Sequence, residues 1–338
     1  MDNHFSRYKI EDRSFVAFIK REIHVKAVQA KFNETDVGKI DIIVAELTSN
    51  LIKHVGDGEL LYRVTPNEDA PVFEIICIDK GYGIADTAKA LRDGVTTTGT
   101  MGGGLGALSR LSTIFQIFSM REWGTVLYSK VTVENKNWVP PKTSVELDIR
   151  GVCVPKVHEE VCGDGYAVVQ TPTLTKILFG DGLGHGVNAK EATDVAKNFF
   201  ISCESKDPVE ILRNMHEKVR RTRGLVAAVA VFDKVANTWS ICGIGNIITR
   251  LYSGIEYRNY MSYNGTIGLN IPKSMNATQV PIERNQHLIM CSDGVQTRWN
   301  LNAYPSIFKY DPTIVAGAIY KDFNRGTDDT SVLIAKVI

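Results

Sequence analysis

The sequence predicts an α+β protein with two domains, and three observations support this prediction. A length of 338 residues suits two domains of ordinary size. The first part alternates long helical patterns with a few strands, whereas many short strands dominate the later part. Between them, the stretch ENKNWVPPK at 134–142 combines prolines with polar residues, as linkers do. We therefore expect one domain at 1–133, a linker at 134–143 and a second domain at 144–338.

Composition argues against several classes of partner and location. The chain has 39 Lys and Arg against 38 Asp and Glu and no long run of like charge, so we expect neither a nucleic-acid nor a membrane partner. No apolar run approaches the roughly 18–20 residues of a membrane helix, and the N-terminus lacks the apolar core of a signal peptide. The six cysteines are scattered without a C-x-x-C pair. We expect reduced core cysteines in a cytoplasmic protein.

Hydrophobic periodicity predicts the elements of the first domain. Apolar residues recur at helical spacing over 14–32, and a second helix is expected over 36–55 with Thr35 or Asp36 as its cap. A further helix is expected over 105–115, after a glycine-rich stretch. The strands expected in this domain read ELLYRVT, VFEIICID, FQIFSM and TVLYSKVTV.

Many short strands and two helices are expected in the second domain. The helices lie at 187–203 and 207–221, and Asp207 followed by Pro208 has the order of a cap and a first-turn proline. The expected strands read VELDIRGVCV, GYAVVQT, TKILFG, LVAAVAVFD, TWSICGIG, IITRLYS, HLIMCS and SVLIAKV.

Three features of the first domain suit a nucleotide pocket. Glu46, Asn50 and His54 are spaced by four on the second helix and share one face, although such a polar stripe is also common on a solvated face. Asp79 ends an apolar strand, where its carboxylate can accept a hydrogen bond from an exocyclic amine. The glycines after it allow a flat ring or a phosphate to approach the backbone. These glycines are Gly81, Gly83, Gly99, Gly102, Gly103, Gly104 and Gly106.

The order of these features resembles the GHKL ATPase superfamily. Its members carry E-x-x-x-N on a helix, D-x-G-x-G after a strand and then a glycine-rich lid. The stretch DKGYGIADTAKALRDGVTTTGTMGGGLGALSRL is similar throughout to the anti-sigma-factor serine kinase branch, the RsbT-like switch kinases. The resemblance covers roughly 12–133 and implies an α/β sandwich, with helices on one face of a mixed sheet, that binds ATP with Mg²⁺.

This resemblance also implies roles for single residues. Asn50 would hold Mg²⁺ against the triphosphate, Glu46 would act as general base on the acceptor hydroxyl, and Asp79 would bind adenine. We expect His54 to be a partly buried structural histidine. No helical segment with a phosphoacceptor histidine precedes the pocket, so protein-serine phosphorylation is expected. The pocket and lid would be shaped by Gly81, Gly83, Gly102, Gly104 and Gly106.

Four aspartates of the second domain share a setting at strand ends. Asp181 and Asp293 each follow an apolar strand, and Asp164 and Asp328 each precede one. An Asp-Gly pair is most often only a turn, but hard divalent ions also need several oxygen ligands of this kind. There is no H-E-x-x-H motif and no cysteine cluster, so zinc is not expected.

The motifs GDGY, GDGLGHG, SDGV and DDTS, in this order, resemble the metal-dependent type 2C protein phosphatases, and within them the SpoIIE/RsbX branch. The resemblance covers about 145–338. It implies a β-sandwich flanked by helices, with two Mn²⁺ or Mg²⁺ ions between the sheets. Asp181 would be the catalytic bridging ligand, with the carbonyl of Gly182 on one ion. The remaining ligands would be Asp164, Asp293 and Asp328.

Two further residues near these motifs are considered for roles, and two segments depart from the family pattern. His185 is a candidate proton donor to the leaving oxygen, and Asp329 is expected outside the ligand set. The family's hydroxyl-bearing G-T-F-x-T segment is here 224–228, GLVAA, without hydroxyls. An asparagine, Asn246, stands where the family has a histidine.

Together the resemblances imply a bifunctional switch enzyme. The first domain would phosphorylate a serine or threonine of a STAS-type anti-anti-sigma protein. The second would remove phosphate from the same or a related protein. Two alternatives stay open for the first domain: an ATP sensor or docking module that gates the phosphatase, or a module that binds a sigma factor. The family also implies a homodimer through the first domain.

Overall fold

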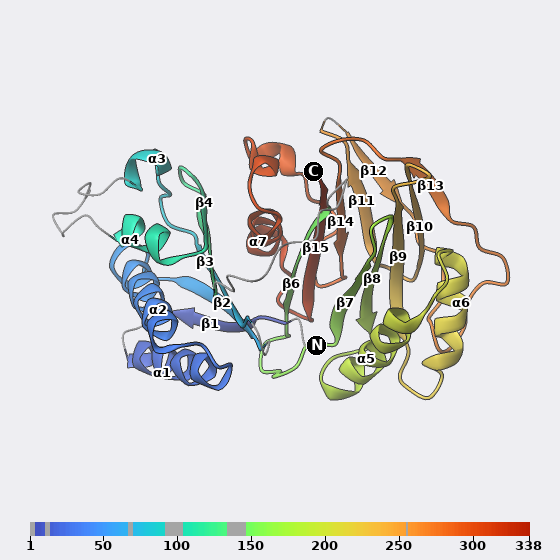
Figure 1. The fold of residues 1–338 in the computed structure, drawn as a ribbon, viewed down its shortest axis with the longest axis horizontal. Coiled ribbons are helices and arrows are strands. Elements are labelled where there is room, and N and C mark those ends of the chain that lie inside the picture. Colours follow the sequence, from blue (N-terminus) through green and yellow to red (C-terminus); the bar gives the residue numbers. More distant parts are fainter. Residues whose placement is uncertain (1–3, 11–13, 67–69, 92–103, 134–146, 255) are drawn as a thin grey trace. The chain divides into compact units, whose positions relative to one another are not determined.

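The computed structural model (Figure 1) divides the chain into two compact units. The first unit holds 5–140 together with 304–318, and the second holds 1–4, 141–303 and 319–338. The structure describes the whole chain except residues 1–3, 11–13, 67–69, 92–103, 134–146 and 255. The expected linker therefore lies outside the described residues, and the domain boundaries drawn from the sequence stay a prediction.

The first unit is built on a five-stranded sheet with the order β1-β2-β3-β5-β4. Every pairing in it is antiparallel, where a mixed sheet was expected. The four expected strands are confirmed, and β1 is a further edge strand that the sequence reading missed because it is short and mostly half-buried. The strands are β1 (Ser6–Ile10), β2 (Gly58–Thr65), β3 (Val72–Asp79), β4 (Ile114–Met120) and β5 (Gly124–Thr132).

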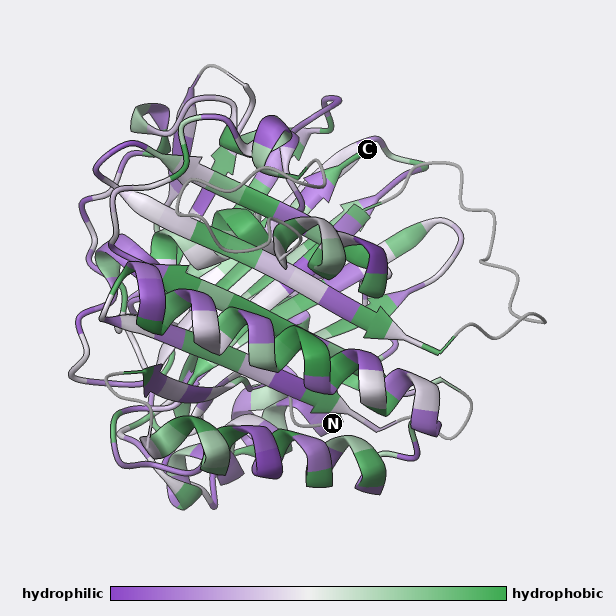
Figure 2. Ribbon diagram, turned by 90° about the vertical axis from the view of Figure 1, so that its left-hand side faces the viewer, coloured by the Kyte–Doolittle hydropathy of each residue, from purple (hydrophilic) through white to green (hydrophobic). Residues whose placement is uncertain are grey.

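Two long helices, α1 (Ser14–Gln29) and α2 (Glu34–His54), lie across one face of this sheet (Figure 2). The cap of α2 is Asn33, whose side chain accepts a hydrogen bond from the Asp36 backbone N–H at 2.8 Å. The predicted cap at Thr35 or Asp36 is therefore wrong by a few residues. Apolar residues of both helices share a core with the sheet, among them Ile19, Ile23, Ile40, Ile43, Leu47, Leu60, Phe73 and Ile75.

Helix α4 (Gly104–Leu111) is shorter than the helix expected over 105–115. The chain turns after Leu111 and enters β4, whose residues pair with β5 from Ile114 onward. β-branched and aromatic side chains favour a strand there, and β4 forms a hairpin with β5, the next strand along the chain. A one-turn helix, α3 (Thr87–Ala90), is capped by Asp86.

Residues 304–318 also belong to the first unit. The Asp311 backbone N–H donates to Gln116 Oε1 at 2.6 Å, and the rings of Tyr310 and Phe118 meet edge to face at 5.3 Å between centroids. This segment contains the short 3-10 turn at Ile307–Lys309 and the beginning of α7 (Pro312–Phe323). The sequence reading missed α7, because its apolar run resembles the buried strands around it.

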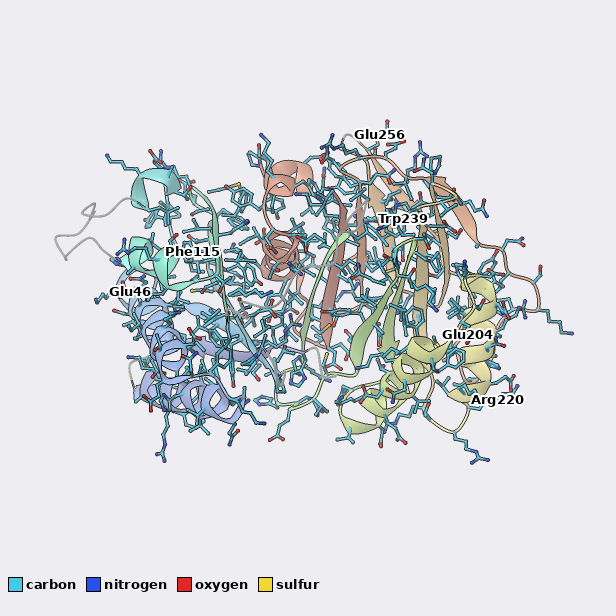
Figure 3. All side chains as sticks on the ribbon, in the orientation of Figure 1. Glu46, Phe115, Glu204, Arg220, Trp239 and Glu256 are labelled. Atoms are coloured by element: carbon cyan, nitrogen blue, oxygen red, sulfur yellow. The ribbon has the colours of Figure 1, made fainter. Side chains whose placement is uncertain are left out.

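The second unit is a sandwich of two five-stranded antiparallel sheets, ordered β13-β10-β9-β8-β7 and β12-β11-β14-β15-β6. Side chains of both sheets form one core, with Trp239 (labelled in Figure 3) and Phe232 in edge-to-face contact. The strands are β6 (Leu147–Val154), β7 (Asp164–Gln170), β8 (Leu174–Gly182), β9 (Leu225–Asp233), β10 (Thr238–Ile244), β11 (Ile248–Tyr252), β12 (Tyr257–Tyr260), β13 (Thr278–Pro281), β14 (His287–Cys291) and β15 (Thr330–Val337).

Two helices, α5 (Val187–Ser202) and α6 (Pro208–Lys218), pack on the β9 sheet through a second apolar cluster that includes Phe200 and Ile211. Asp207 caps α6 through the Val209 backbone N–H, as predicted. The expected sandwich flanked by helices is thereby confirmed. The edge strands β12 and β13 were missed, because each has four residues of mixed polarity.

The six cysteines are all free thiols, and five of them are buried. They occupy core positions, as expected. None of the helices in the described part of the chain has the length and apolar character needed to cross a membrane.

Candidate functional site

Strand register brings two of the predicted aspartates together in the second unit. Asp164 begins β7 and Asp181 stands near the end of β8, and the antiparallel pairing sets these two residues directly opposite each other. Asp293 follows β14 by two residues and Asp328 precedes β15 by two, and these strands are neighbours in the other sheet. The sandwich therefore collects all four predicted aspartates at strand ends.

The charges of the other three predicted aspartates act on Asp181. Burial raises the pKa of Asp181 well above its usual range, and the negative charges of Asp164, Asp293 and Asp328 raise it further. Like charges so near one another favour either a proton or a cation between them. Asp181 is therefore the centre of the acidic set.

Asp164 is the most deeply buried member of the set, with 7% of its surface exposed. Burial raises the pKa of Asp164 to about 7, although the hydroxyl of Ser292 opposes the shift. Within the described part of the chain, its Oδ2 atom is buried without a hydrogen-bond partner. A buried carboxylate oxygen without a partner is costly, and a bound cation would satisfy it.

The donor chemistry fits a hard divalent cation, because the set offers only carboxylate and carbonyl oxygens. The arrangement of these side chains does not yet form a full coordination shell. Among the described residues, no group of three or more acidic, histidine or cysteine side chains is placed to hold one metal ion. The paired Asp164 and Asp181 thus form the core of the site, with Asp293 and Asp328 close by, and the full ligand set stays a prediction.

Gly182 lets the Asp181 turn approach helix α5. A methyl group at Gly182 would lie 2.2 Å from the carbonyl oxygen of Ala189, so any side chain would displace backbone. The Gly182 backbone N–H donates to the Gly163 carbonyl at 3.3 Å, which ties this turn to the residue before Asp164. The predicted role of the Gly182 carbonyl as a ligand is not tested by this packing.

Two residues outside the predicted ligand set hold it in place. Asp329 is 3% exposed and accepts hydrogen bonds from the backbone N–H groups of Lys156 and Gly163, both at 2.7 Å. It thereby orders the loop that leads into Asp164. Asn246 donates from Nδ2 to Asp293 Oδ2 at 3.0 Å. The only sequence signals were the paired acids in DDTS and an asparagine in place of the family's histidine.

His185 pairs with a glutamate rather than with the aspartates. Its Nδ1 atom lies 2.6 Å from Glu159 Oε1, and both side chains are partly exposed. Glu159 belongs to the loop that Asp329 holds. The candidate role of His185 as a proton donor stays a prediction.

The predicted nucleotide residues of the first unit lie on α2, on β3 and at the start of α4. Glu46 (labelled in Figure 3) and Asn50 are half-buried on α2. A methyl group at Gly104 would lie 2.1 Å from Glu46 Oε1, so the glycine lets this carboxylate rest against the start of α4. Gly106 is buried in α4, and Gly102 lies outside the described residues.

Asp79 ends β3, and its Oδ1 atom accepts the Gly81 backbone N–H at 2.8 Å. Gly83 has a φ of +74°, and a methyl group there would lie 1.9 Å from the Met120 carbonyl, so only glycine fits. His54 is exposed at the end of α2, which corrects the expectation of a partly buried histidine. Because its side chain is exposed, His54 does not contribute to the packed core of the first unit.

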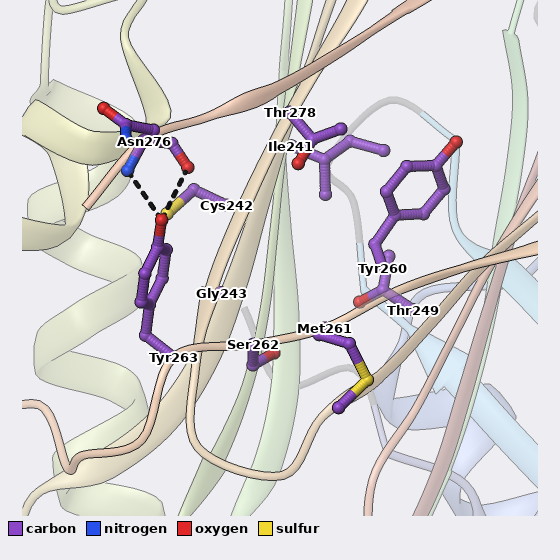
Figure 4. Close-up of a pocket in the computed structure, with 10 residues that line it drawn as sticks. All are labelled: Ile241, Cys242, Gly243, Thr249, Tyr260, Met261, Ser262, Tyr263, Asn276 and Thr278. Carbon is purple, nitrogen blue, oxygen red and sulfur yellow. Dashed lines mark hydrogen bonds between the residues drawn. The ribbon is translucent and has the colours of Figure 1, made fainter.

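A small cavity of about 60 Å³ in the second unit contains none of the predicted site residues (Figure 4). It lies between β10, β11 and residues 260–263. The Tyr263 hydroxyl at its edge accepts the Asn276 backbone N–H at 2.9 Å. Its size suits ordered water, and the buried hydroxyls of Thr249 and Tyr260 have no partner among the described residues.

Comparisons with known proteins match each part of the chain separately. Residues 171–338 match the family model of stage II sporulation protein E (SpoIIE). The serine/threonine-protein kinase RsbT of Bacillus subtilis (strain 168) is 30% identical over 99 residues, which are 29% of this chain and 74% of RsbT.

Two solved structures share the sandwich fold. The first comes from work on the bacterial stressosome, described as a modular system that has been adapted to control secondary messenger signalling. It is 25% identical to this chain with a TM-score of 0.53, and the match covers 56% of this chain and 99% of that chain. The other, RsbX in complex with magnesium, is 18% identical with a TM-score of 0.51, covering 58% of this chain and 100% of RsbX. The RsbX likeness shows the fold alone.

These matches agree with the architecture built above from strand register and packing. The RsbT match and the five-stranded sheet with its covering helices concern the first part of the chain, and the SpoIIE match and the sandwich concern the second. Residues 171–338 match the SpoIIE family model and share the sandwich fold of the RsbX structure. Through its N-terminal part, the chain belongs to the RsbT-like serine/threonine-protein kinase family.

Proposed function

We propose that this protein is a bifunctional partner-switching regulator. Its N-terminal half transfers the γ-phosphate of ATP to a serine or threonine of a STAS-type protein. Its C-terminal half hydrolyses the phosphoserine or phosphothreonine of the same or a related protein. The observation that carries the proposal is the strand register that sets Asp164 opposite Asp181, with Asp293 and Asp328 at the ends of two paired strands of the other sheet. A phosphate-hydrolysing centre with two cations needs such an acidic set.

In the phosphatase half, two Mn²⁺ or Mg²⁺ ions would be held by Asp164, Asp181, Asp293 and Asp328 with the Gly182 carbonyl. When bound, such ions activate a water molecule and offset the charge of the phosphate. Asn246 orients Asp293 through its 3.0 Å hydrogen bond. Asp329 orders the loop before Asp164 through two backbone N–H groups.

In the kinase half, ATP with Mg²⁺ would be held by Asn50 and Asp79. Such a complex presents the γ-phosphate to the acceptor hydroxyl. Glu46 accepts the proton of that hydroxyl. Its carboxylate rests beside Gly104 at the start of α4, where the helix N-terminus offers N–H groups to phosphate. The base and a phosphate-binding element are therefore adjacent.

Incubation of the full chain with ATP, Mg²⁺, Mn²⁺ and a cognate STAS protein tests both halves. We expect phosphorylated partner to accumulate with Asp181→Asn, because hydrolysis is blocked, and never to form with Asn50→Ala. The partner's phosphorylation state is followed by intact-mass spectrometry. If both variants behave like the parent, the assigned sites are wrong.

The same assay separates the alternative in which the first half only senses nucleotide. In that case ATP changes the rate of phosphate release from a phosphorylated partner, while no phosphate from ATP reaches any protein. A parallel pull-down with a sigma factor distinguishes the sigma-binding alternative.

A further inference from the structure

One arginine lies against the turn that follows Asp181. A methyl group at Gly184 would be 3.2 Å from Arg223 Nη1, and Gly184 comes three residues after Asp181. The Leu183 backbone N–H donates to the Gly224 carbonyl at 3.1 Å, which joins the turn to the arginine's own segment. The Arg223 side chain therefore lies against the turn that follows Asp181.

The backbone on both sides of Arg223 is held firmly. Gly224 has a φ of +83°, and a methyl group there would lie 2.7 Å from the Ile267 carbonyl. The Gly224 N–H donates to Thr222 Oγ1 at 3.1 Å, and that hydroxyl donates to the Val219 carbonyl at 2.7 Å. The start of the arginine side chain is thus set before any ligand binds, which lowers the entropic cost of binding.

Among the described residues, Arg223 has no ion-pair partner, unlike two other cations of this unit. Lys197 pairs with Asp194 at 2.7 Å, and Arg220 pairs with Glu217 at 2.9 Å. Arg223 is exposed and, within the part of the chain that the structure describes, makes no hydrogen bond or ion pair. An unpaired guanidinium against the turn that follows Asp181 is free to bind an anion brought to that turn.

We propose that Arg223 binds the phosphate group of the phosphorylated protein substrate, an inference that rests on the proposed phosphatase function. A phosphoserine dianion that approaches Asp181 meets the negative field of the aspartates. The planar guanidinium offsets that field locally and donates two parallel N–H bonds to phosphate oxygens. Arg223 thereby favours the phosphorylated over the unphosphorylated partner. It is a specificity-determining residue, whereas the aspartates serve the hydrolysis.

The test measures binding apart from turnover. A fluorescent peptide with a non-hydrolysable phosphonate in place of phosphoserine, and its unmodified serine twin, are titrated with the full chain by anisotropy. Charge-assisted hydrogen bonds are worth about 1.5–3 kcal/mol, so Arg223→Ala should weaken phosphonate binding by roughly 10–100-fold without affecting the twin. Arg223→Lys should fall between, because a lysine keeps the charge but loses the bidentate geometry.

The matched control is Arg220→Ala, which changes an exposed arginine two residues after the end of α6 (Figure 3) that is already paired with Glu217. It should leave phosphonate binding within about twofold, as expected for a surface ion pair. Circular dichroism confirms that each variant is folded. If Arg223→Ala binds the phosphonate as the parent does, or the parent does not prefer it over the twin, the inference is overturned.

Failure of the proposed function has a separate signature. Metal-dependent phosphate release from a phosphoserine peptide, and its loss in Asp181→Asn, report on the phosphatase. Absence of release together with Arg223-dependent phosphonate binding would overturn the function but support the inference. Phosphate release by Arg223→Ala with the same KM as the parent would support the proposed function but overturn the inference about Arg223.

Discussion

The two candidate sites are assembled in different ways. In the second unit, Asp164 and Asp181 face each other because two neighbouring strands pair in one register. In the first unit, Glu46 meets Gly104 because a helix face and the first turn of another helix come together. The acids of the sandwich are buried among like charges, whereas Glu46 is half-buried beside a helix N-terminus. The sheet thus gathers like charges that favour a proton or a cation between them, whereas the helix N-terminus presents backbone N–H groups.

The largest effect should come from Gly182→Ala, which would disturb the backbone next to Asp181 in the second unit. The added methyl group would lie 2.2 Å from the Ala189 carbonyl, so β8 and α5 must separate. Overpacking of this kind costs about 1–3 kcal/mol or more. We expect a lower unfolding temperature by calorimetry and loss of phosphate release, with phosphotransfer from ATP kept. Unchanged thermal stability would contradict the close approach of Gly182 to α5.

Gly104→Ala should impair the proposed kinase site of the first unit but should lower the thermal stability less than Gly182→Ala does. The methyl group would meet Glu46 Oε1, the far end of a flexible side chain that can move away. Because the proposed base is then displaced, we expect phosphotransfer to fall by roughly 10²-fold, within the usual contribution of general-base catalysis. A radiolabel transfer assay measures this.

Gly38→Ala is the matched control for that variant. Gly38 lies inside α2, and a methyl group there would meet nothing within 4 Å. It should stabilise the first unit by about 0.5–1 kcal/mol, because alanine loses less backbone entropy in a helix. Equal phosphotransfer by Gly104→Ala and Gly38→Ala would remove Glu46 from its proposed role.

Asn246→Ala should weaken the second site moderately. The change deletes the hydrogen bond to Asp293 Oδ2 but leaves the carboxylates in place. Partners that orient a metal ligand typically contribute 10–100-fold, so we expect about a 10-fold rise in the Mn²⁺ concentration needed for half-maximal phosphate release. Asn198→Ala, on the exposed side of α5, serves as control and should leave that concentration unchanged. A shift of the same size in both variants would refute the orienting role.

The smallest effect concerns stability in acid and does not involve either site. Burial alone would raise the pKa of Glu74, but Arg63 and the Tyr128 hydroxyl outweigh it, so the pKa lies below its usual range. Arg63 Nη2 is 2.5 Å and the Tyr128 hydroxyl 2.7 Å from the carboxylate oxygens. Glu74 therefore stabilises the first unit above the usual glutamate pKa, and this stabilisation is lost as pH falls through the lowered value.

Urea unfolding at a series of pH values, for the parent and Glu74→Gln, measures that contribution. The parent should be the more stable near neutral pH, and the difference should shrink as the pH falls below about 4. Phosphotransfer by the two proteins should remain equal near neutral pH. A constant difference across the whole range would show that the charge of Glu74 is not responsible.

Most of the secondary structure of this protein can be predicted from local sequence patterns. The helices α1, α2, α5 and α6 and the long strands follow from periodicity and caps, since each buries an apolar face of fixed period. The short edge strands could not be predicted, because their residues show no clear periodicity. Helix α7 could not be predicted either, because its continuous apolar run resembles a buried strand. The end of the helix expected over 105–115 was also misplaced, because β4 is selected by its pairing with β5.

For the site, the sequence by itself determined which residue types stand at strand ends and helix faces, and the motifs in their order determined the family. The tertiary structure alone decided that Asp164 faces Asp181, that Asn246 touches Asp293, that Asp329 holds the loop before Asp164, and that Arg223 lies on the Asp181 turn. The physical reason is that these contacts join residues far apart in the chain. Strand register, sandwich packing and glycine turns set them, and no local period encodes such distances.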